Sequence, residues 1–157
     1  MDRSRLSRFV NQRLNELPLE APAVVSPFTP VRAAVATMQE GSRSCVLAVD
    51  DGKLAGIFTE RDVLNRCMGD DFDWDQPLNT AVLTREPRTI ASNRTIAEAI
   101  MLMQQFHYRT LPVMENGSVV GLVRLGDLLR HLAEEYPEDV LNLPPRPHQV
   151  MEKSEGG

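Results

Sequence analysis

Residues 50–64 read DDGKLAGIFTERDVL, and residues 115–129 read ENGSVVGLVRLGDLL. The two segments align without a gap at an offset of 65 residues, and both glycines of the first segment meet glycines of the second. The same offset relates residues 31–38 to residues 96–103, where apolar side chains recur at the spacing of an amphipathic helix. Such a match over about 50 residues per copy is typical of a duplicated supersecondary unit.

Each copy predicts the same order of elements, β-α-β-β-α. In both copies an Asp-Gly or Asn-Gly turn separates two short apolar strands, which favours a hairpin because both turn residues adopt positive φ. One copy is too small to bury its sheet and its helices, so we expect an α+β fold in which two copies pack sheet to sheet. The expected strands are residues 24–25, 45–49 and 54–58, then 89–90, 111–114 and 119–123; the expected helices begin near Thr29, Thr59, Asn93 or Arg94, and Leu125.

The segments outside the two copies differ in character. The first residues predict an extra helix, because Phe9 and Leu14 fall on one apolar face. The linker between the copies is acidic and turn-rich, but Phe72 and Trp74 indicate that it is packed. The expected boundaries are 1–16 for the N-terminal helix, 17–68 for the first repeat, 69–80 for the linker, 81–136 for the second repeat and 137–157 for a Pro-rich tail.

Composition narrows the class of protein. The 157 residues carry a net charge of -5, which argues against a nucleic-acid partner, because nucleic-acid-binding proteins usually present a basic surface. The N-terminal residues contain no apolar core of signal-peptide length, and no later stretch is long enough for membrane insertion. Cys45 and Cys67 form neither a CxxC motif nor a disulfide framework. We therefore expect a cytoplasmic protein.

The repeated unit resembles the cystathionine-β-synthase (CBS) domain. The resemblance rests on GIFTERD (residues 56–62), GLVRLGD (residues 121–127), LTREPRTI (residues 83–90) and FHYRTLPV (residues 106–113). It covers about residues 17–135 and implies a pseudo-twofold pair of repeats, often called a Bateman module. The resemblance also implies a homodimer, an adenosine-containing ligand in a cleft between the repeats, and regulation of an effector protein that the sequence does not identify.

The family's nucleotide motif is Gly, apolar, any, Ser/Thr, any, any, Asp, and residues 56–62 match it fully. Thr59 and Asp62 are three residues apart at a helix start, so they lie on one side of it. The Asp62 carboxylate can accept hydrogen bonds from ribose hydroxyls, the Thr59 hydroxyl can meet a phosphate, and Gly56 can let the ligand approach the backbone. The same pair also fits an N-terminal capping box, and the sequence leaves both interpretations open.

The second copy departs from this motif. It keeps Gly121 and Asp127 but has Arg124 where the family has Ser or Thr. Arg124 can either bind a phosphate as a bidentate donor or fill the cleft and pair with Asp127. We favour one competent cleft, the one that contains Asp62, over two.

Other candidate ligand-binding residues are implied by the resemblance or by chemistry. Basic and hydroxyl side chains near the strand starts are candidates for phosphate contacts, and apolar side chains near the repeat starts are candidates for an adenine sandwich. The phosphate candidates are Arg109, Thr110, Ser44, Cys45 and Arg85, with Arg43 and His107 nearby; the adenine candidates are Ile57, Val25 and Ile90, with Val24 and Val123.

These observations favour a stand-alone sensor of AMP, ADP or ATP that catalyses nothing. One alternative is a dimerisation or interaction module without a ligand, in which the LNLPPRP segment (residues 141–147) docks a partner. Another is a sensor of S-adenosylmethionine or NAD(H). We expect no enzyme, because no motif pairs a nucleophile with a base, and no metal, because the three histidines are scattered.

Overall fold

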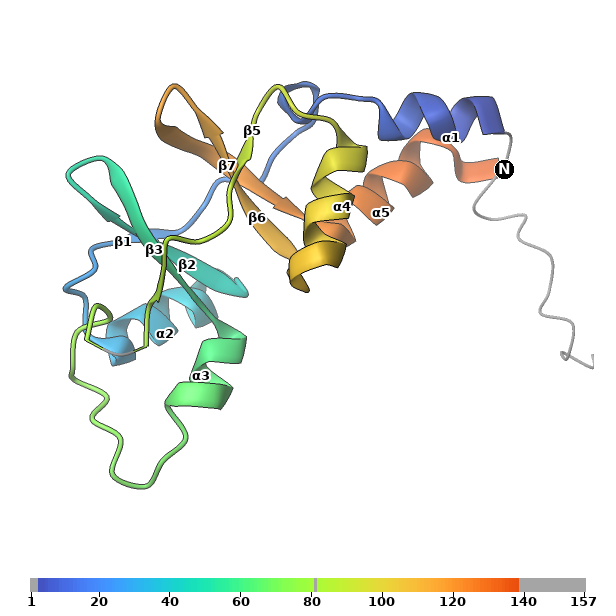
Figure 1. Ribbon diagram of the computed structural model, residues 1–157. Helices are drawn as coiled ribbons and strands as arrows, with labels where there is room; N and C mark the ends of the chain where they lie inside the picture. The colour runs from blue at the N-terminus through green and yellow to red at the C-terminus, as the bar shows by residue number, and fades with distance from the viewer. Residues whose placement is uncertain (1–2, 81, 139–157) are drawn as a thin grey trace, which may run out of the picture.

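The computed structural model describes residues 3–80 and 82–138 and contains two βαββα units (Figure 1). This confirms the predicted order of elements. The first unit consists of β1 (Val24–Val25), α2 (Val31–Glu40), β2 (Cys45–Asp50), β3 (Lys53–Thr59) and α3 (Glu60–Arg66). The second consists of β5 (Ile90–Ala91), α4 (Ile96–Phe106), β6 (Thr110–Glu115), β7 (Ser118–Arg124) and α5 (Leu125–Glu135); α1 (Arg3–Val10), a 3-10 turn (Leu14–Glu16) and β4 (Thr84–Arg85) lie outside the two units.

The predicted hairpins form with two-residue turns. Asp51 and Gly52 have φ values of 49° and 74°, and Asn116 and Gly117 have 49° and 78°. Positive φ at both central residues matches the right-handed twist of the flanking strands, and Asn, Asp and Gly adopt it most readily.

The last strand of each repeat pairs with the other repeat's lead-in segment, through β4 in the first sheet and through a single bridge in the second. In the first sheet, β1 pairs parallel with β2, β2 pairs antiparallel with β3, and β4 pairs antiparallel with β3 through Gly56 and Arg85. In the second sheet, β5, β6 and β7 repeat this order, and Glu20 pairs with Leu122 of β7. Glu20 and Arg85 are related by the same 65-residue offset. The lead-in of each repeat therefore crosses to the last strand of the other, which gives the pair its pseudo-twofold symmetry.

This crossing explains the glycine shared by the two motifs. A Cβ atom placed on Gly56 would lie 2.6 Å from the backbone oxygen of Thr84, and one on Gly121 would lie 2.7 Å from Leu19 Cβ. The space beside Gly56 is thus filled by the second repeat's lead-in, not by a ligand as the motif suggested. Glycine is needed there because two backbones approach closely.

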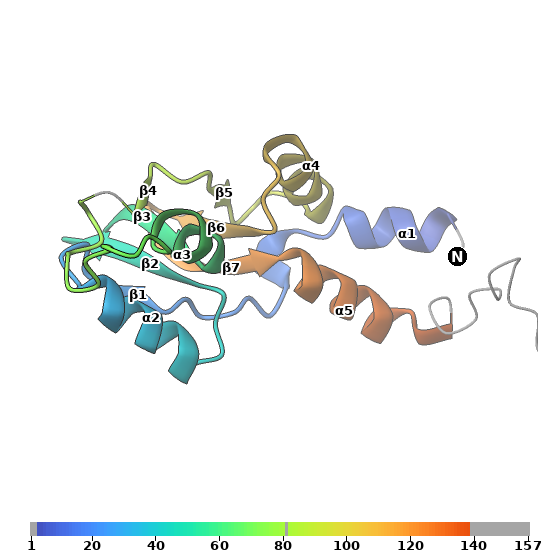
Figure 2. The same ribbon diagram turned by 90° about the horizontal axis from the view of Figure 1, so that it is seen from below.

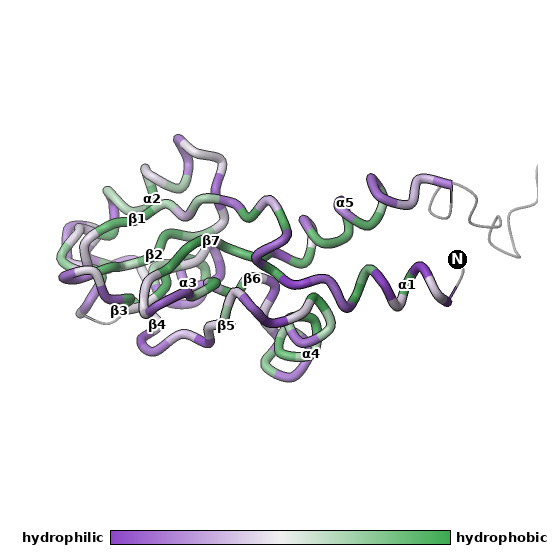
Figure 3. The backbone as a smooth tube through the Cα atoms, turned by 90° about the horizontal axis from the view of Figure 1, so that it is seen from above, coloured by the Kyte–Doolittle hydropathy of each residue, from purple (hydrophilic) through white to green (hydrophobic). Residues whose placement is uncertain are grey.

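Three clusters of apolar side chains hold the fold together. One lies inside each repeat, between its sheet and its helices, and includes Phe58 and Leu111, which are fully buried. The third joins the two sheets through Leu47, Ile57 and Leu122. Figure 3 shows the hydrophobic stretches of the chain along the strands and the purple, hydrophilic ones at loops and helix ends.

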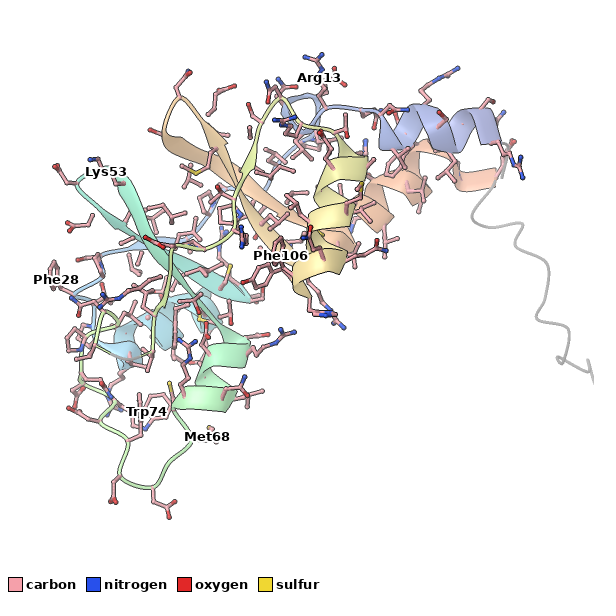
Figure 4. All side chains as sticks on the ribbon, in the orientation of Figure 1. Arg13, Phe28, Lys53, Met68, Trp74 and Phe106 are labelled. Carbon is pink, nitrogen blue, oxygen red and sulfur yellow. The ribbon has the colours of Figure 1, made fainter. Side chains whose placement is uncertain are left out.

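Both flanking segments are packed. Figures 1 and 2 show α1 beside α5, where Phe9 contacts Tyr136 edge to face with ring centroids 6.5 Å apart. The linker packs against the first repeat through Leu78, which is fully buried, and Phe72 lies 5.0 Å from Trp74 between ring centroids. Figure 4 labels Trp74. Within the described residues no helix has the length and apolar character needed to cross a membrane. The expected Pro-rich tail, including LNLPPRP, lies outside the described residues except for Pro137 and Glu138.

Candidate functional site

A cavity of about 770 Å³ opens at the junction of the two repeats. Its walls come from the end of β3 and the start of α3 in the first repeat, and from the segment before β5, the start of β6 and the start of α5 in the second. We call it the Asp62 cleft. Nine of the residues singled out in the sequence line it: Ser44, Cys45, Ile57, Thr59, Asp62, Arg109, Thr110, Arg124 and Asp127.

Asp62 is the buried acid of this cleft. Its Oδ2 accepts hydrogen bonds from the Thr59 backbone N–H at 2.8 Å and from the Thr59 hydroxyl at 2.9 Å. The Asp62 N–H donates to Thr59 Oγ1 at 3.2 Å, which completes a capping box at the start of α3. The capping interpretation therefore describes the Thr59 hydroxyl and one oxygen of Asp62, and the hydroxyl positions the carboxylate instead of pointing to a phosphate.

The other carboxylate oxygen of Asp62 is outside the capping box. Oδ1 lies 3.4 Å from the Thr84 hydroxyl and 3.7 Å from Arg66 Nε, and both contacts are longer than a good hydrogen bond. An ionised carboxylate oxygen offers two lone pairs, and the existing contacts of Oδ1 are long, so Oδ1 can still accept a hydrogen bond from a ligand hydroxyl. The capping and ligand-binding interpretations thus concern different oxygens and are compatible.

Positive charge gathers around the cleft. Five arginines line it against three carboxylates. Among the described residues neither Arg88 nor Arg109 has an acidic partner within salt-bridge distance; the Arg88 guanidinium lies 4.1 Å from the centroid of the Phe106 ring. Figure 4 places Phe106 at the end of α4. Two arginines without acidic partners, 21 residues apart in the sequence, meet at one cavity, which favours an anionic ligand.

The second copy of the motif adopts the pairing that the sequence left open. Arg124 Nε donates to Asp127 Oδ2 at 2.9 Å, and Arg124 Nη2 donates to Asp127 Oδ1 at 3.3 Å. The hydrogen bond to Asp127 raises the pKa of Arg124, so the guanidinium stays charged. Arg124 is therefore hydrogen-bonded to Asp127, the carboxylate that corresponds to Asp62 in the second repeat.

Six of the phosphate and adenine candidates do not line the cleft: Val24, Val25, Arg43, Arg85, Ile90 and Val123. Val25 packs against the core of the first repeat, and Ile90 is buried in the core of the second. They pack in the cores because helices cover the short strands β1 and β5, and their assignment to an adenine sandwich stays a prediction. Arg85 is exposed and donates to the Asn79 carbonyl at 2.7 Å, and its assignment as a phosphate contact also stays a prediction.

Sequence reasoning missed several lining residues. Thr84, Pro87 and Arg88 line the cleft because the lead-in of the second repeat crosses to β3 on its way to β5. Tyr108 and His107 also line the cleft, and the 65-residue offset relates Tyr108 to Arg43. From the sequence, His107 was predicted only as a residue near the phosphate candidates. A comparison of the copies position by position can find Tyr108, but the crossing that brings in Thr84 has no local signal.

The Cys45 thiol forms an apolar part of the wall. Burial raises the pKa of Cys45 to about 11, and the negative charge of Glu20 adds to the effect. Burial also raises the pKa of Cys67. Since the thiolate is the reactive form, Cys45 is a small apolar group at neutral pH and not a nucleophile.

The fold and the cleft define a class of protein, the tandem pair of βαββα repeats with a ligand cleft at the repeat junction. The model of the CBS domain matches residues 14–69 and 80–134, and the chain belongs to the CBS domain family. The CBS domain-containing protein YhcV of Bacillus subtilis is 31% identical over 106 residues, which cover 68% of this chain and 75% of that protein. The CBS domain-containing protein CBSCBSPB3 of Arabidopsis thaliana is 38% identical over 80 residues, but these span 51% of this chain and 14% of that protein.

Solved structures share the fold. An uncharacterized conserved protein from Pyrococcus horikoshii has a TM-score of 0.71 and 25% identity, covering 78% of this chain and 92% of its own. The CBS domain protein PAE2072 from Pyrobaculum aerophilum, solved in complex with AMP, has a TM-score of 0.68 and 20% identity, covering 78% and 99%. The CBS domain pair of protein MJ0100, solved with 5-methylthioadenosine and S-adenosyl-L-methionine, has a TM-score of 0.70 and 18% identity, covering 80% and 98%. At these lower identities, the last two likenesses concern the fold alone.

Proposed function

We propose that the chain is a regulatory module that binds an adenine nucleotide of the AMP, ADP or ATP class in the Asp62 cleft and signals to a partner protein without catalysing a reaction. The observation that carries the proposal is the Oδ1 of Asp62, which lies outside the capping box and has only long contacts, in a cavity that Arg88 and Arg109 also line. A volume of about 770 Å³ lies within the range of small-molecule sites. The AMP complex of PAE2072 supports the ligand class.

The chemistry of the walls favours a phosphorylated ligand. Asp62 Oδ1 can accept a ribose hydroxyl, and the apolar surfaces of Ile57 and Pro112 can contact the adenine ring. Arg88 and Arg109 supply charge-assisted donors for phosphate oxygens. S-adenosylmethionine, which MJ0100 binds, carries a sulfonium cation and would place that charge among arginines. We therefore place AMP, ADP and ATP ahead of S-adenosylmethionine.

Replacement of Asp62 by alanine is expected to weaken nucleotide binding by about 1.5–3 kcal/mol, because a hydrogen bond to a charged group is lost. Isothermal titration calorimetry with AMP, ADP, ATP, NADH and S-adenosylmethionine gives the affinity of each. The control is Glu98→Ala, since Glu98 caps α4 with the same distances, 2.8 Å to the Thr95 N–H and 3.2 Å from its own N–H to Thr95 Oγ1. It should lose a similar amount of helix capping and retain the affinity.

The outcomes of this titration separate the candidates. An equal loss in both variants would mean that Asp62 acts only through the stability of its helix, and the site assignment would be rejected. No binding of any of the five compounds at millimolar concentration would favour a dimerisation or interaction module without a ligand. Tighter binding of NADH or S-adenosylmethionine than of AMP, ADP and ATP would change the ligand class and keep the cleft.

We also propose that the chain forms a homodimer through α3 and α5. Leu64 and Leu129 occupy equivalent positions of the two repeats and are 68% and 60% exposed. Met68, just beyond α3, is 64% exposed (Figure 4). Apolar side chains gathered on the outer faces of equivalent helices suit an isologous interface, in which the same surface meets its copy.

The double variant Leu64→Glu/Leu129→Glu is expected to convert the dimer to a monomer, because it places charges in the apolar contact. Light scattering coupled to size exclusion should then read one chain of 17.6 kDa instead of two. The control is Phe28→Glu, since Phe28 is 64% exposed but lies on the loop between β1 and α2. A wild-type chain that elutes as a monomer would refute the proposed interface.

The buried free thiols of Cys45 and Cys67 suit a reducing compartment, so we place the protein in the cytoplasm. We also propose that the effector is a protein. The expectation that the chain is not an enzyme belongs to the same proposal.

A further inference from the structure

Four charged side chains form a continuous network on the Asp127 side of the molecule. Arg43 Nη1 lies 3.1 Å from Glu20 Oε1, Glu20 Oε2 lies 2.8 Å from Arg124 Nη2, and Arg124 Nε lies 2.9 Å from Asp127 Oδ2. Their side chains are between 25% and 30% exposed, so the network is half-buried. We call these four residues the ionic clasp. It joins the lead-in of the first repeat, the segment before β2 and the start of α5.

The clasp stands at the place that corresponds to the Asp62 cleft in the other repeat. Under the 65-residue offset, Asp127 corresponds to Asp62 and Arg124 to Thr59. The other two members also differ from their counterparts, because Glu20 corresponds to Arg85 and Arg43 to Tyr108. Arg85 turns away to the Asn79 carbonyl, and Tyr108 lines the cleft.

The clasp leaves little of Asp127 for a ligand. Its Oδ2 is held by Arg124, and its Oδ1 lies 3.3 Å from Arg124 Nη2 and 3.5 Å from Arg130 Nη1. The equivalent oxygen of Asp62 also has two long contacts, but the Oδ2 of Asp62 is held by the Thr59 N–H and hydroxyl and not by a guanidinium. A ribose hydroxyl that bound Asp127 would have to displace a bidentate guanidinium, which would then keep only Glu20 as its ion-pair partner.

Arg124 also separates two spaces. It lines both the Asp62 cleft and a smaller groove of about 300 Å³ formed by residues 17–20 and α5. Ser44 and Cys45, which the offset relates to Arg109 and Thr110, lie on the cleft side of this partition. The groove and the parts of a second site are therefore adjacent, and Arg124, Asp127 and Arg130 line both spaces.

We propose that the ionic clasp limits the chain to one nucleotide site, and that Arg124 is the residue that determines this stoichiometry. The proposal rests on the proposed function for the ligand class. A threonine at position 124 restores the full motif, frees Asp127, and joins the groove to Ser44 and Cys45. The second site would then bind the same class of adenine nucleotide as the first.

The test uses AMP as the probe and isothermal titration calorimetry of the full chain to count sites. We expect one equivalent of AMP for the wild type, two for Arg124→Thr, and one for Asp62→Ala/Arg124→Thr, whose remaining site is the new one. The control is Arg94→Thr, which removes an ion pair with Glu98 and leaves the clasp intact, and should bind one equivalent. If circular dichroism shows that Arg124→Thr is unfolded, Glu20→Gln/Arg124→Thr takes its place, because it also removes the charge of Glu20, which would otherwise keep only Arg43 as a partner.

Each result decides between the two proposals. Two equivalents for the wild type, or no binding by Asp62→Ala/Arg124→Thr while the wild type binds one, would overturn the role of Arg124 and leave the proposed function intact. No binding by the wild type but one equivalent for the double variant would support the clasp and reject the Asp62 cleft. Absence of AMP binding in every variant would overturn both.

Discussion

Replacement of Leu14 by alanine is expected to lower the free energy of unfolding by about 2–5 kcal/mol, the usual range when a fully buried leucine is truncated and leaves a cavity. Leu14 has no exposed surface, although it lies in a short turn near the start of the chain. Its side chain belongs to the core of the second repeat, and its backbone N–H donates to the Arg94 carbonyl at 2.9 Å. The N-terminal segment is therefore part of the second repeat's core.

Urea denaturation followed by circular dichroism measures this change. The control is Leu6→Ala on α1, because Leu6 is 42% exposed and the same substitution there should change stability by no more than about 0.5 kcal/mol. A Leu14→Ala chain as stable as Leu6→Ala would mean that the first residues are an appendage and that the second repeat is complete without them.

Replacement of Gly56 by alanine is expected to cost about 3 kcal/mol, at the upper end of the usual range for overpacking. The new methyl group would lie 2.6 Å from the Thr84 carbonyl oxygen, which belongs to a paired strand and cannot move alone. Gly121→Ala should cost less, because its closest contact is the Leu19 side chain at 2.7 Å and its nearest backbone oxygen is 3.3 Å away.

Gly126 supplies the control for this pair. It lies in α5 with nothing within 4 Å of its added Cβ, so alanine should stabilise the helix by up to about 1 kcal/mol. The three substitutions are compared by thermal and urea unfolding. If Gly56→Ala matched Gly126→Ala in stability, the close approach of the second repeat's lead-in to β3 would be refuted.

Much of the fold could be predicted because its signals are local and occur twice. The helix periodicity, the Asp-Gly and Asn-Gly turns and the strand lengths each repeat at one offset, and the structure confirms the elements that they predict. The crossing of the lead-in segments could not be predicted, because residues 17–20 and 82–85 carry no pattern that names a partner strand. That crossing also decides why Gly56 is a glycine and why Thr84 lines the cleft.

The position of a candidate residue was predictable where the motif or the register of the repeat fixed it. Asp62 and Arg109 line the cleft as the motif and the register indicated, while their roles in binding stay predictions. Val25 and Ile90 pack in the cores and do not line the cleft, because an apolar residue on a short strand can face either a core or a ligand, and the sequence does not say which face the helices cover. The partner of Arg124 could be identified only from the structure, because the two alternatives, a phosphate and Asp127, are both anionic hydrogen-bond acceptors.

The exchange of strands between the halves has an evolutionary consequence. A half-length ancestor with the same strand pairing would have had to lend its first residues to an identical chain and borrow that chain's residues in return. In such a pair each chain would have completed the sheet edge of the other, and duplication with fusion would place both edges in one polypeptide. Two fused halves can differ in sequence, as they do where Asp127 has Arg124 beside it and Asp62 has Thr59.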